Sequence, residues 1–307
     1  MRFMMLIKSN AQAEAGVLPD EELLTAMGRY NEELVKAGVL LGGEGLQASS
    51  KGVRVRLIGN KAAVVDGPFA EAKELVAGYW MLTVKSKEEA IAWAKRVPGP
   101  AGEIELRLLY EVSDFPADPA EASAGSEGWR EQEQRFRDGT APSHGPAAAP
   151  IARQPKTKRF LVMLKSDAYT ESGVLPDPQT LAAMGGLMED LARTGALLAG
   201  EGLKPSAHGA RIKFSGDKRT LIDGPFSETK EMIAGFTMIQ MKTMQDAIAF
   251  AERWLRIHDA AVNAQAGEIE IRQVFETSDF PVDAAEKPDG WRAREEAMRQ
   301  TLGSSGS

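Results

Sequence analysis

The hydrophobic pattern at the start of the chain predicts a buried strand followed by an amphipathic helix. Residues 3–8 are apolar at nearly every position, which is typical of a strand whose sheet is covered on both faces. Residues 20–37 then show apolar residues at helical spacing: Leu23, Met27, Tyr30 and Leu34. Asp20 is a suitable N-cap for this helix, and Gly38 is a suitable end for it.

The pattern that follows predicts a hairpin, a further strand, a second helix and a last strand. Residues 53–58 and 62–66 are rich in β-branched residues and flank a turn that begins at Gly59. Residues 79–84 are again apolar throughout, and Ser86 with Glu89 forms a capping-box pattern before the second helix. Polar and apolar residues then alternate over 103–111. This order predicts a ferredoxin-like α+β module with one added strand.

The whole pattern occurs twice. Asp66-Gly67-Pro68-Phe69 recurs as Asp223-Gly224-Pro225-Phe226, and Gly43-Glu44-Gly45-Leu46 recurs as Gly200-Glu201-Gly202-Leu203. A period of this length predicts two domains, each with its own core, and not a solenoid. We expect modules at residues 1–118 and 158–283. A short helix and a Pro/Ala-rich linker are expected at 119–157, and a short helix and a flexible tail at 284–307.

The apolar strands also predict how the modules assemble. Two helices cover one face of such a sheet. The large apolar side chains of residues 3–8 and 79–84 would then form an exposed hydrophobic patch on the other face. We therefore expect the two sheets to pack face to face as a pseudo-dimer within one chain. The alternative is that each copy pairs with another chain, and further homo-oligomerisation is compatible with either arrangement.

Composition narrows the functional classes. A net charge of −7 and the interspersed basic residues argue against a nucleic-acid-binding surface. The sequence shows no membrane span and no secretory signal, so the expected location is the cytoplasm. The chain has no cysteine and three histidines, His144, His208 and His258, and none of these histidines recurs in both copies. A histidine-rich metal site is therefore not expected, and neither is a cofactor.

The repeated nine-residue run Asp-Gly-Pro-Phe-Ala-Glu-Ala-Lys-Glu from Asp66, with its counterpart from Asp223, resembles the YCII-related family, in particular its DGPF branch. The resemblance covers about residues 1–116 and 158–281 and implies a dimeric α/β-barrel fold. Members of this branch are largely uncharacterised, and some are encoded near extracytoplasmic-function sigma factors. Better-defined relatives carry a His-Asp pair proposed as catalytic, and this sequence departs from that pattern.

Asp66 and Asp223 are the candidate catalytic residues, since each falls where a strand ends and the chain must turn. Partial burial at the mouth of an inter-sheet cavity would raise the pKa of such a carboxyl toward that of a general acid or base. The competing interpretation is structural. In that case the aspartate bonds its own turn while the Phe of the motif fills the core.

Further charged residues are candidate ligand-binding groups because they repeat in both copies: Glu44, Glu71, Lys73, Glu201, Glu228 and Lys230. Closely spaced charges are also typical of a solvated surface, and Glu44 between glycines is equally typical of a loop. Glu105 and Arg107 recur as Glu270 and Arg272. They would line a cavity if their strand faces the partner sheet, and would be solvated if it is an edge strand.

Two functional hypotheses follow. The first is a cofactor-independent enzyme or binder of a small polar ligand, with two equivalent pockets between the sheets. The second is a non-catalytic regulatory or protein-interaction module, linked to a sigma factor, that docks through its tails or outer helices.

Overall fold

The computed structural model describes residues 1–59, 61–71, 75–99, 102–115, 156–228, 231–262 and 267–280. The linker and the two tail helices expected from the sequence lie outside these residues. The first half contains these helices and strands: β1 (Arg2–Lys8), α1 (Ala11–Glu14), α2 (Glu21–Lys36), β2 (Leu40–Gly45), β3 (Val53–Ile58), β4 (Lys61–Asp66), β5 (Val76–Thr83), α3 (Lys87–Ala94) and β6 (Glu103–Leu108). The second half repeats them: β7 (Lys158–Lys165), α5 (Ala168–Glu171), α6 (Pro178–Arg193), β8 (Leu197–Gly202), β9 (Ala210–Ser215), β10 (Lys218–Asp223), β11 (Ile233–Met241), α7 (Met244–Ala261) and β12 (Glu268–Gln273).

Local signals in the sequence set the beginnings of the long helices. Asp20 Oδ1 accepts the Leu23 N–H at 2.8 Å, and Asp177 Oδ1 accepts the Thr180 N–H at 2.7 Å. Pro178 occupies the first turn of α6, where its missing N–H leaves no hydrogen bond unmade. These N-caps confirm the starts that were predicted for α2 and α6.

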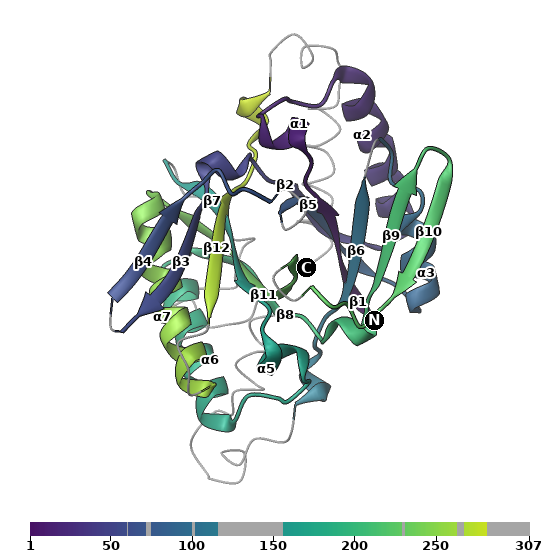
Figure 1. Cartoon of the computed structure of the whole chain (residues 1–307). Coiled ribbons are helices and arrows are strands. Elements are labelled where there is room, and N and C mark those ends of the chain that lie inside the picture. Colours follow the sequence, from purple (N-terminus) through teal and green to yellow (C-terminus); the bar gives the residue numbers. More distant parts are fainter. Residues whose placement is uncertain are drawn as a thin grey trace, which may run out of the picture.

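The fold is mixed α+β with two six-stranded antiparallel sheets. Their strand orders are β10-β9-β6-β1-β5-β2 and β4-β3-β12-β7-β11-β8. Each sheet therefore combines four strands of one half with a hairpin of the other half. In the second sheet, residues 53–56 of β3 pair antiparallel with residues 268–271 of β12. The hairpins are thus exchanged between the halves, and Figure 1 shows β3–β4 and β9–β10 on opposite flanks of the molecule.

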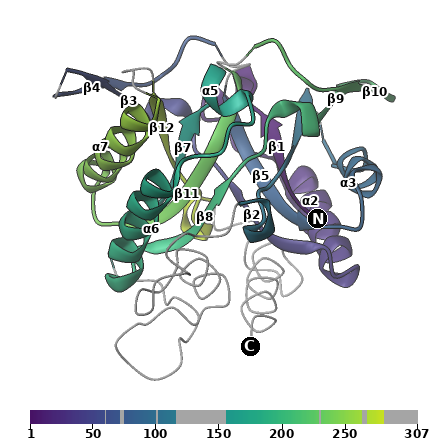
Figure 2. The same ribbon diagram turned by 90° about the horizontal axis from the view of Figure 1, so that it is seen from below.

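Three apolar cores hold these layers together. One core lies between the first sheet and helices α2 and α3, and a second lies between the other sheet and helices α6 and α7. The third contains side chains from β1 and β5 together with side chains from β7 and β11, for example Leu6, Tyr79, Met163 and Phe236. The two sheets therefore share a core, and the helices lie on opposite outer sides (Figure 2).

Strand β2 was not predicted from the sequence. A loop was one of two interpretations for Glu44, but residues 40–45 form an edge strand that pairs with β5. A Cβ on Gly43 would lie 2.8 Å from Cδ1 of Trp80. Glycine is needed there because the indole packs directly against the backbone of β2.

Candidate functional site

The most unusual feature of the interior is a pair of buried clusters of charged side chains. The first, the Glu105 cluster, consists of Lys8, Glu105, Arg107, Glu171 and Arg211. The second, the Glu270 cluster, consists of Lys165, Glu270, Arg272, Glu14 and Arg54. The members correspond position by position between the two copies. Each cluster takes three residues from one half of the chain and two from the other half.

Strand alternation places these charges on the side of the sheet that faces the other sheet. Ile104 and Leu106 of β6 point into the core beneath α2 and α3, so Glu105 and Arg107 point the opposite way. The sequence left open whether β6 is an edge strand. It is not, because the exchanged strand β9 pairs with it, from Ile104↔Ile212 to Leu106↔Ala210. The exchange therefore converts a potentially solvated row of charges into a buried one.

Glu105 is the centre of its cluster and is fully buried. Its carboxylate lies 3.2 Å from Lys8 Nζ, 3.3 Å from Arg107 NH1 and 2.9 Å from Arg211 NH2. Burial alone would raise the pKa of Glu105, but the three surrounding cations outweigh it and lower the pKa to about 2. Glu105 is therefore a carboxylate throughout the physiological pH range.

The Glu270 cluster repeats this geometry. Glu270 lies 3.0 Å from Arg54 and 3.1 Å from Arg272 NH1. Arg272 NH2 reaches Glu14 Oε1 at 3.4 Å, just as Arg107 NH2 reaches Glu171 Oε1 at 3.1 Å. Burial lowers the pKa of the neighbouring Lys165, which makes its amine easier to deprotonate than an exposed lysine.

The Asp-Gly-Pro-Phe turn closes each cluster on one side. The Phe69 N–H donates to Ser49 Oγ at 3.1 Å, and the Phe69 ring lies 4.3 Å from the Arg54 guanidinium. The Ser49 N–H donates in turn to Glu14 Oε2 at 2.9 Å. Contacts thus run in a ring from Arg272 through Glu14, Ser49, Phe69, Arg54 and Glu270 back to Arg272.

The second copy of the turn makes the same contacts. The Phe226 N–H donates to Ser206 Oγ at 3.1 Å, and the Phe226 ring lies 4.2 Å from the Arg211 guanidinium. The Ser206 N–H donates to Glu171 Oε2 at 2.8 Å. The motif recognised from the sequence therefore organises the charge clusters through its phenylalanine.

The aspartates of the motif lie away from these rings. Asp66 and Asp223 are the last residues of β4 and β10, which are edge strands, and both aspartates are exposed. Asp223 Oδ1 accepts a hydrogen bond from Lys87 Nζ at 2.9 Å. The catalytic role assigned to the two aspartates stays a prediction.

The remaining predicted site residues fall into three groups. Glu71 and Glu228 are exposed, and Glu228 lies 3.7 Å from Arg211 NH1. Lys73 and Lys230 lie outside the described residues. Glu44 and Glu201 form ion pairs at the junction of the two halves.

Glu44 and Glu201 form mirror-related ion pairs across the two halves. Arg159 NH1 donates to Glu44, and Arg2 NH1 donates to Glu201. Burial raises the pKa of Glu201 to about 7, although the adjacent Arg2 charge opposes that rise. Both glutamates are therefore partly buried groups at the junction of the halves and not freely solvated loop residues.

Several members of the clusters were missed by reasoning from the sequence. Lys8 and Lys165 lie at the ends of apolar strands, and Arg54 and Arg211 lie in hairpins whose partner strand belongs to the other half. The usable signal was their repetition in both copies. Among the residues that the structure describes, no group of three His, Asp or Glu side chains is arranged to hold a metal ion.

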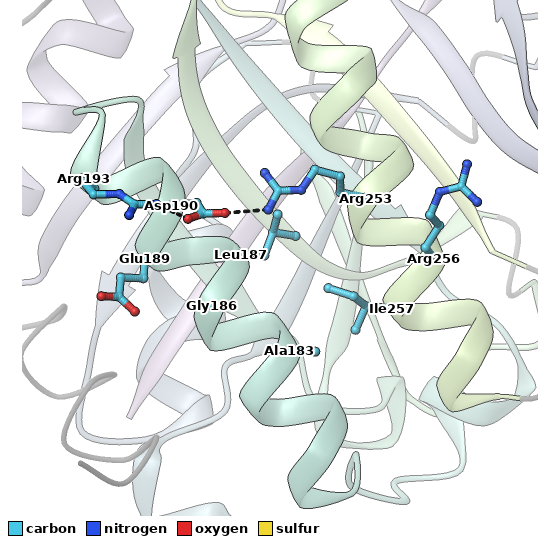
Figure 3. Close-up of a pocket in the computed structure, with 9 residues that line it drawn as sticks. All are labelled: Ala183, Gly186, Leu187, Glu189, Asp190, Arg193, Arg253, Arg256 and Ile257. Carbon is cyan, nitrogen blue, oxygen red and sulfur yellow. Dashed lines mark hydrogen bonds and ion pairs between the residues drawn. The ribbon is translucent and has the colours of Figure 1, made fainter. Parts of the chain in front are cut away.

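A separate groove lies on the outer surface of the second half, between α6 and α7 (Figure 3). Its volume is about 520 Å³, and Leu187 and Ile257 line its apolar part. Asp190 bonds Arg193 and lies 2.6 Å from Arg253 NH2 across the groove. This groove lies on the helical side of its sheet, away from the charge clusters.

These features define a duplicated α+β protein with paired ionic clusters between its sheets. The family model of the YCII-related domain matches residues 1–114 and 159–278. The chain therefore belongs to the YCII-related domain family, with one match in each half. It is also similar to an uncharacterized protein of Rhizobium meliloti (strain 1021), with 27% identity over 103 residues, which is 32% of this chain and 83% of that protein. No helix in the described ranges is long and apolar enough to cross a membrane.

Proposed function

We propose that the protein binds a small polar ligand at two equivalent sites between its sheets, next to the Glu105 and Glu270 clusters. The observation that carries this proposal is that five charged residues, each buried or partly buried, occur at corresponding positions in both halves. Burying ions is costly, and apolar side chains of similar volume often give equal or greater stability. Two clusters retained in parallel are therefore better explained by chemistry at the site than by stability of the fold.

The charges of the clusters indicate what kind of ligand fits. In the Glu105 cluster, Lys8, Arg107 and Arg211 face Glu105 and Glu171, and Arg211 also lies 3.2 Å from Glu231. Each of these cations is therefore already paired with a carboxylate. A site whose charges are already paired favours a ligand that exchanges hydrogen bonds with it over one that brings a large net charge. If the site at the Glu270 cluster transforms its ligand, Lys165 is the acid/base candidate because burial lowers its pKa toward neutrality. The proposal invokes no cofactor.

The fold that we propose for these sites is a pair of ferredoxin-like modules forming a dimeric α/β barrel within one chain, as in the DGPF branch of the family. The order β6-β1-β5-β2 in one half, with α2 and α3 on one face, supports it. The core shared by the two sheets supports the barrel arrangement.

The proposed ligand binding can be tested by calorimetric titration, using small polar compounds that a thermal-shift screen has selected. We expect two ligands per chain for the wild type, one for Arg107→Lys or Arg272→Lys, and none for the double variant. Glu33→Gln, which alters an exposed ion pair, is the control for nonspecific effects of charge. Binding that is unchanged in the double variant would rule out these clusters. Asp66→Asn with Asp223→Asn tests separately whether the motif aspartates act on the bound compound.

The groove between α6 and α7 favours a second candidate function, a protein-interaction module that docks through its outer helices. Arg253 and Arg193 lie on either side of the groove, beside the apolar Leu187 and Ile257. A partner helix with acidic and apolar residues would fit this surface. Arg253→Glu should abolish capture of such a partner, a sigma factor for example, without changing ligand binding between the sheets.

A further inference from the structure

The second half carries a buried histidine that has no counterpart in the first half. Helix α7 has 18 residues, whereas the corresponding α3 has 8. The additional turns of α7 contain His258 and Asp259, and both side chains are buried. This is a difference between two copies that otherwise repeat their buried charges.

His258 lies between two carboxylates. Its Nε2 is 3.2 Å from Asp167 Oδ2, and its Nδ1 is 3.2 Å from Asp259 Oδ1. Asp259 Oδ1 also accepts the Gly267 N–H at 3.0 Å, at the beginning of β12. The contact with Asp167 is an ion-pair distance and not an aligned hydrogen bond. An imidazolium is attracted to both carboxylates at once, whereas a neutral imidazole presents a lone pair to one of them.

The charged groups that act on His258 come from two elements, and both are acidic. Asp167 belongs to the connection between β7 and α5, and Asp259 belongs to α7 itself. Burial lowers the pKa of His258, but the two carboxylates outweigh burial and raise it above its ordinary value. The same pairing lowers the pKa of Asp167 to about 2, so that this carboxylate is ionised when it faces the ring.

Asp167 connects this histidine to the Glu105 cluster. It is the N-cap of α5, where its Oδ1 accepts the Thr170 N–H at 2.8 Å. The last residue of this four-residue helix is Glu171, which lies 3.1 Å from Arg107 NH2 and accepts the Ser206 N–H. A shift of α5 therefore moves a member of the cluster directly.

The first half lacks this connection. Asn10 stands where Asp167 stands, and it caps α1 through the Ala13 N–H at 2.9 Å. Glu14 at the end of α1 reaches Arg272 and the Ser49 N–H just as Glu171 reaches Arg107 and the Ser206 N–H. The Glu270 cluster thus has the same internal contacts, but its short helix is capped by Asn10, whose amide side chain is not ionisable.

We propose that protonated His258 holds α5, and with it Glu171, in place, so that pH regulates the Glu105 cluster and leaves the Glu270 cluster unaffected. Regulation of ligand binding by this device rests on the function proposed above. The device itself does not need a ligand, so it can be tested in the unliganded protein. The two sites would then be alike in their residues and unequal in their response to pH.

An NMR titration of the full chain from about pH 5 to about pH 9 tests this proposal, since that range brackets the ordinary histidine pKa. The chain has only three histidines, so His258→Gln identifies the His258 ring signal by its absence. The amides of Ser206 and Ser49 report the contacts to Glu171 and Glu14. Ser206 shares its 3-10 turn with the exposed His208, whereas Ser49 shares its turn with Lys51. The Ser206 amide is therefore followed in a His208→Gln background as well as in the wild type.

We expect the His258 ring to titrate with a midpoint above 6.5, and the Ser206 amide shift to follow the same midpoint while the Ser49 amide does not. Asp167→Asn keeps an N-cap residue and copies Asn10, so it should remove the response of Ser206 without unfolding α5. The proposal would be overturned if the chemical shift of the Ser206 amide did not change with pH, or if the Ser206 and Ser49 amides shifted equally. An unchanged Ser206 response in Asp167→Asn would also overturn it. If the titration gives the expected results but no compound binds between the sheets, the proposed function is wrong, whereas the pH-dependent hold of His258 on α5 is supported.

Discussion

Replacing Glu105 with Gln removes one charge from the most buried ionic group of the protein. Glutamine keeps the shape of the side chain, but three cations remain around it: Lys8, Arg107 and Arg211. Bulk solvent cannot reach these cations freely to replace the carboxylate, because Glu105 and Arg107 are 0% exposed and Lys8 and Arg211 are each 6% exposed. The free energy of unfolding should therefore fall sharply.

Two physical arguments give the size of this loss. Removing one partner of a buried ion pair typically destabilises a protein by about 3–5 kcal/mol. A pKa lowered to about 2 in the folded state, against 4.5 for a free side chain, points to stabilisation of the same order at neutral pH. The expected loss for Glu105→Gln at pH 7 is therefore on the order of 3 kcal/mol.

The pH dependence gives a second signature. Because folding lowers the pKa of Glu105, its contribution is fully present above about pH 4.5 and is lost as the pH falls toward 2. The difference in unfolding free energy between the wild type and Glu105→Gln should shrink over that range. Urea denaturation at a series of pH values measures this difference.

The exposed pair of Arg96 and Glu33 supplies the control. Both side chains are about half exposed, so Glu33→Gln should change the stability by less than about 1 kcal/mol. A Glu105→Gln variant that loses no more than this control, or a difference that does not change with pH, would refute the buried-cluster reasoning.

Three further changes test local features by the same denaturation assay. Gly67→Ala should destabilise the protein by about 1–3 kcal/mol or more, because the new Cβ would lie 1.9 Å from the Ser49 carbonyl oxygen. Gly42→Ala is the control: its Cβ would meet no atom within 4 Å, so the stability should change little beyond the effect of strand propensity. Asp177→Ala should cost about 1 kcal/mol through loss of the N-cap of α6, and an unchanged stability would contradict that role. Leu34→Ala should cost about 2–5 kcal/mol, since this side chain is 0% exposed beneath the first sheet, and a smaller loss would mean that the core collapses around the gap.

Much of the fold was predictable because its signals are local. Helical spacing and the N-caps at Asp20 and Asp177 depend on residues within a turn or two of each other, and the structure reproduces both. Strand β2 was missed because one of its glycines, Gly43, is required by contact with Trp80, a residue distant in the sequence, and not by a turn. Local propensity carries no information about such a contact.

The candidate site was predictable only in part. Glu105 and Arg107 were noticed because they recur, but their alternation with apolar residues is equally typical of a solvated edge strand. Lys8 and Arg54 recur as well, but nothing in their local sequence indicates their role, since each joins its cluster only through contacts with distant segments. The Asp-Gly-Pro-Phe motif drew attention to its aspartate, whereas the structure places its phenylalanine against the cluster.

The amino-acid sequence by itself determined that the chain contains two copies of one α+β pattern, where the long helices begin, and which charges recur. The tertiary structure alone decided that the β3–β4 and β9–β10 hairpins are exchanged between the halves. A hairpin has the same alternating pattern whichever sheet it joins, because that choice depends on packing between distant segments and not on propensity. The exchange covers the edge of β6, buries Glu105 beside Arg211, and so turns repeated surface-like charges into a candidate site.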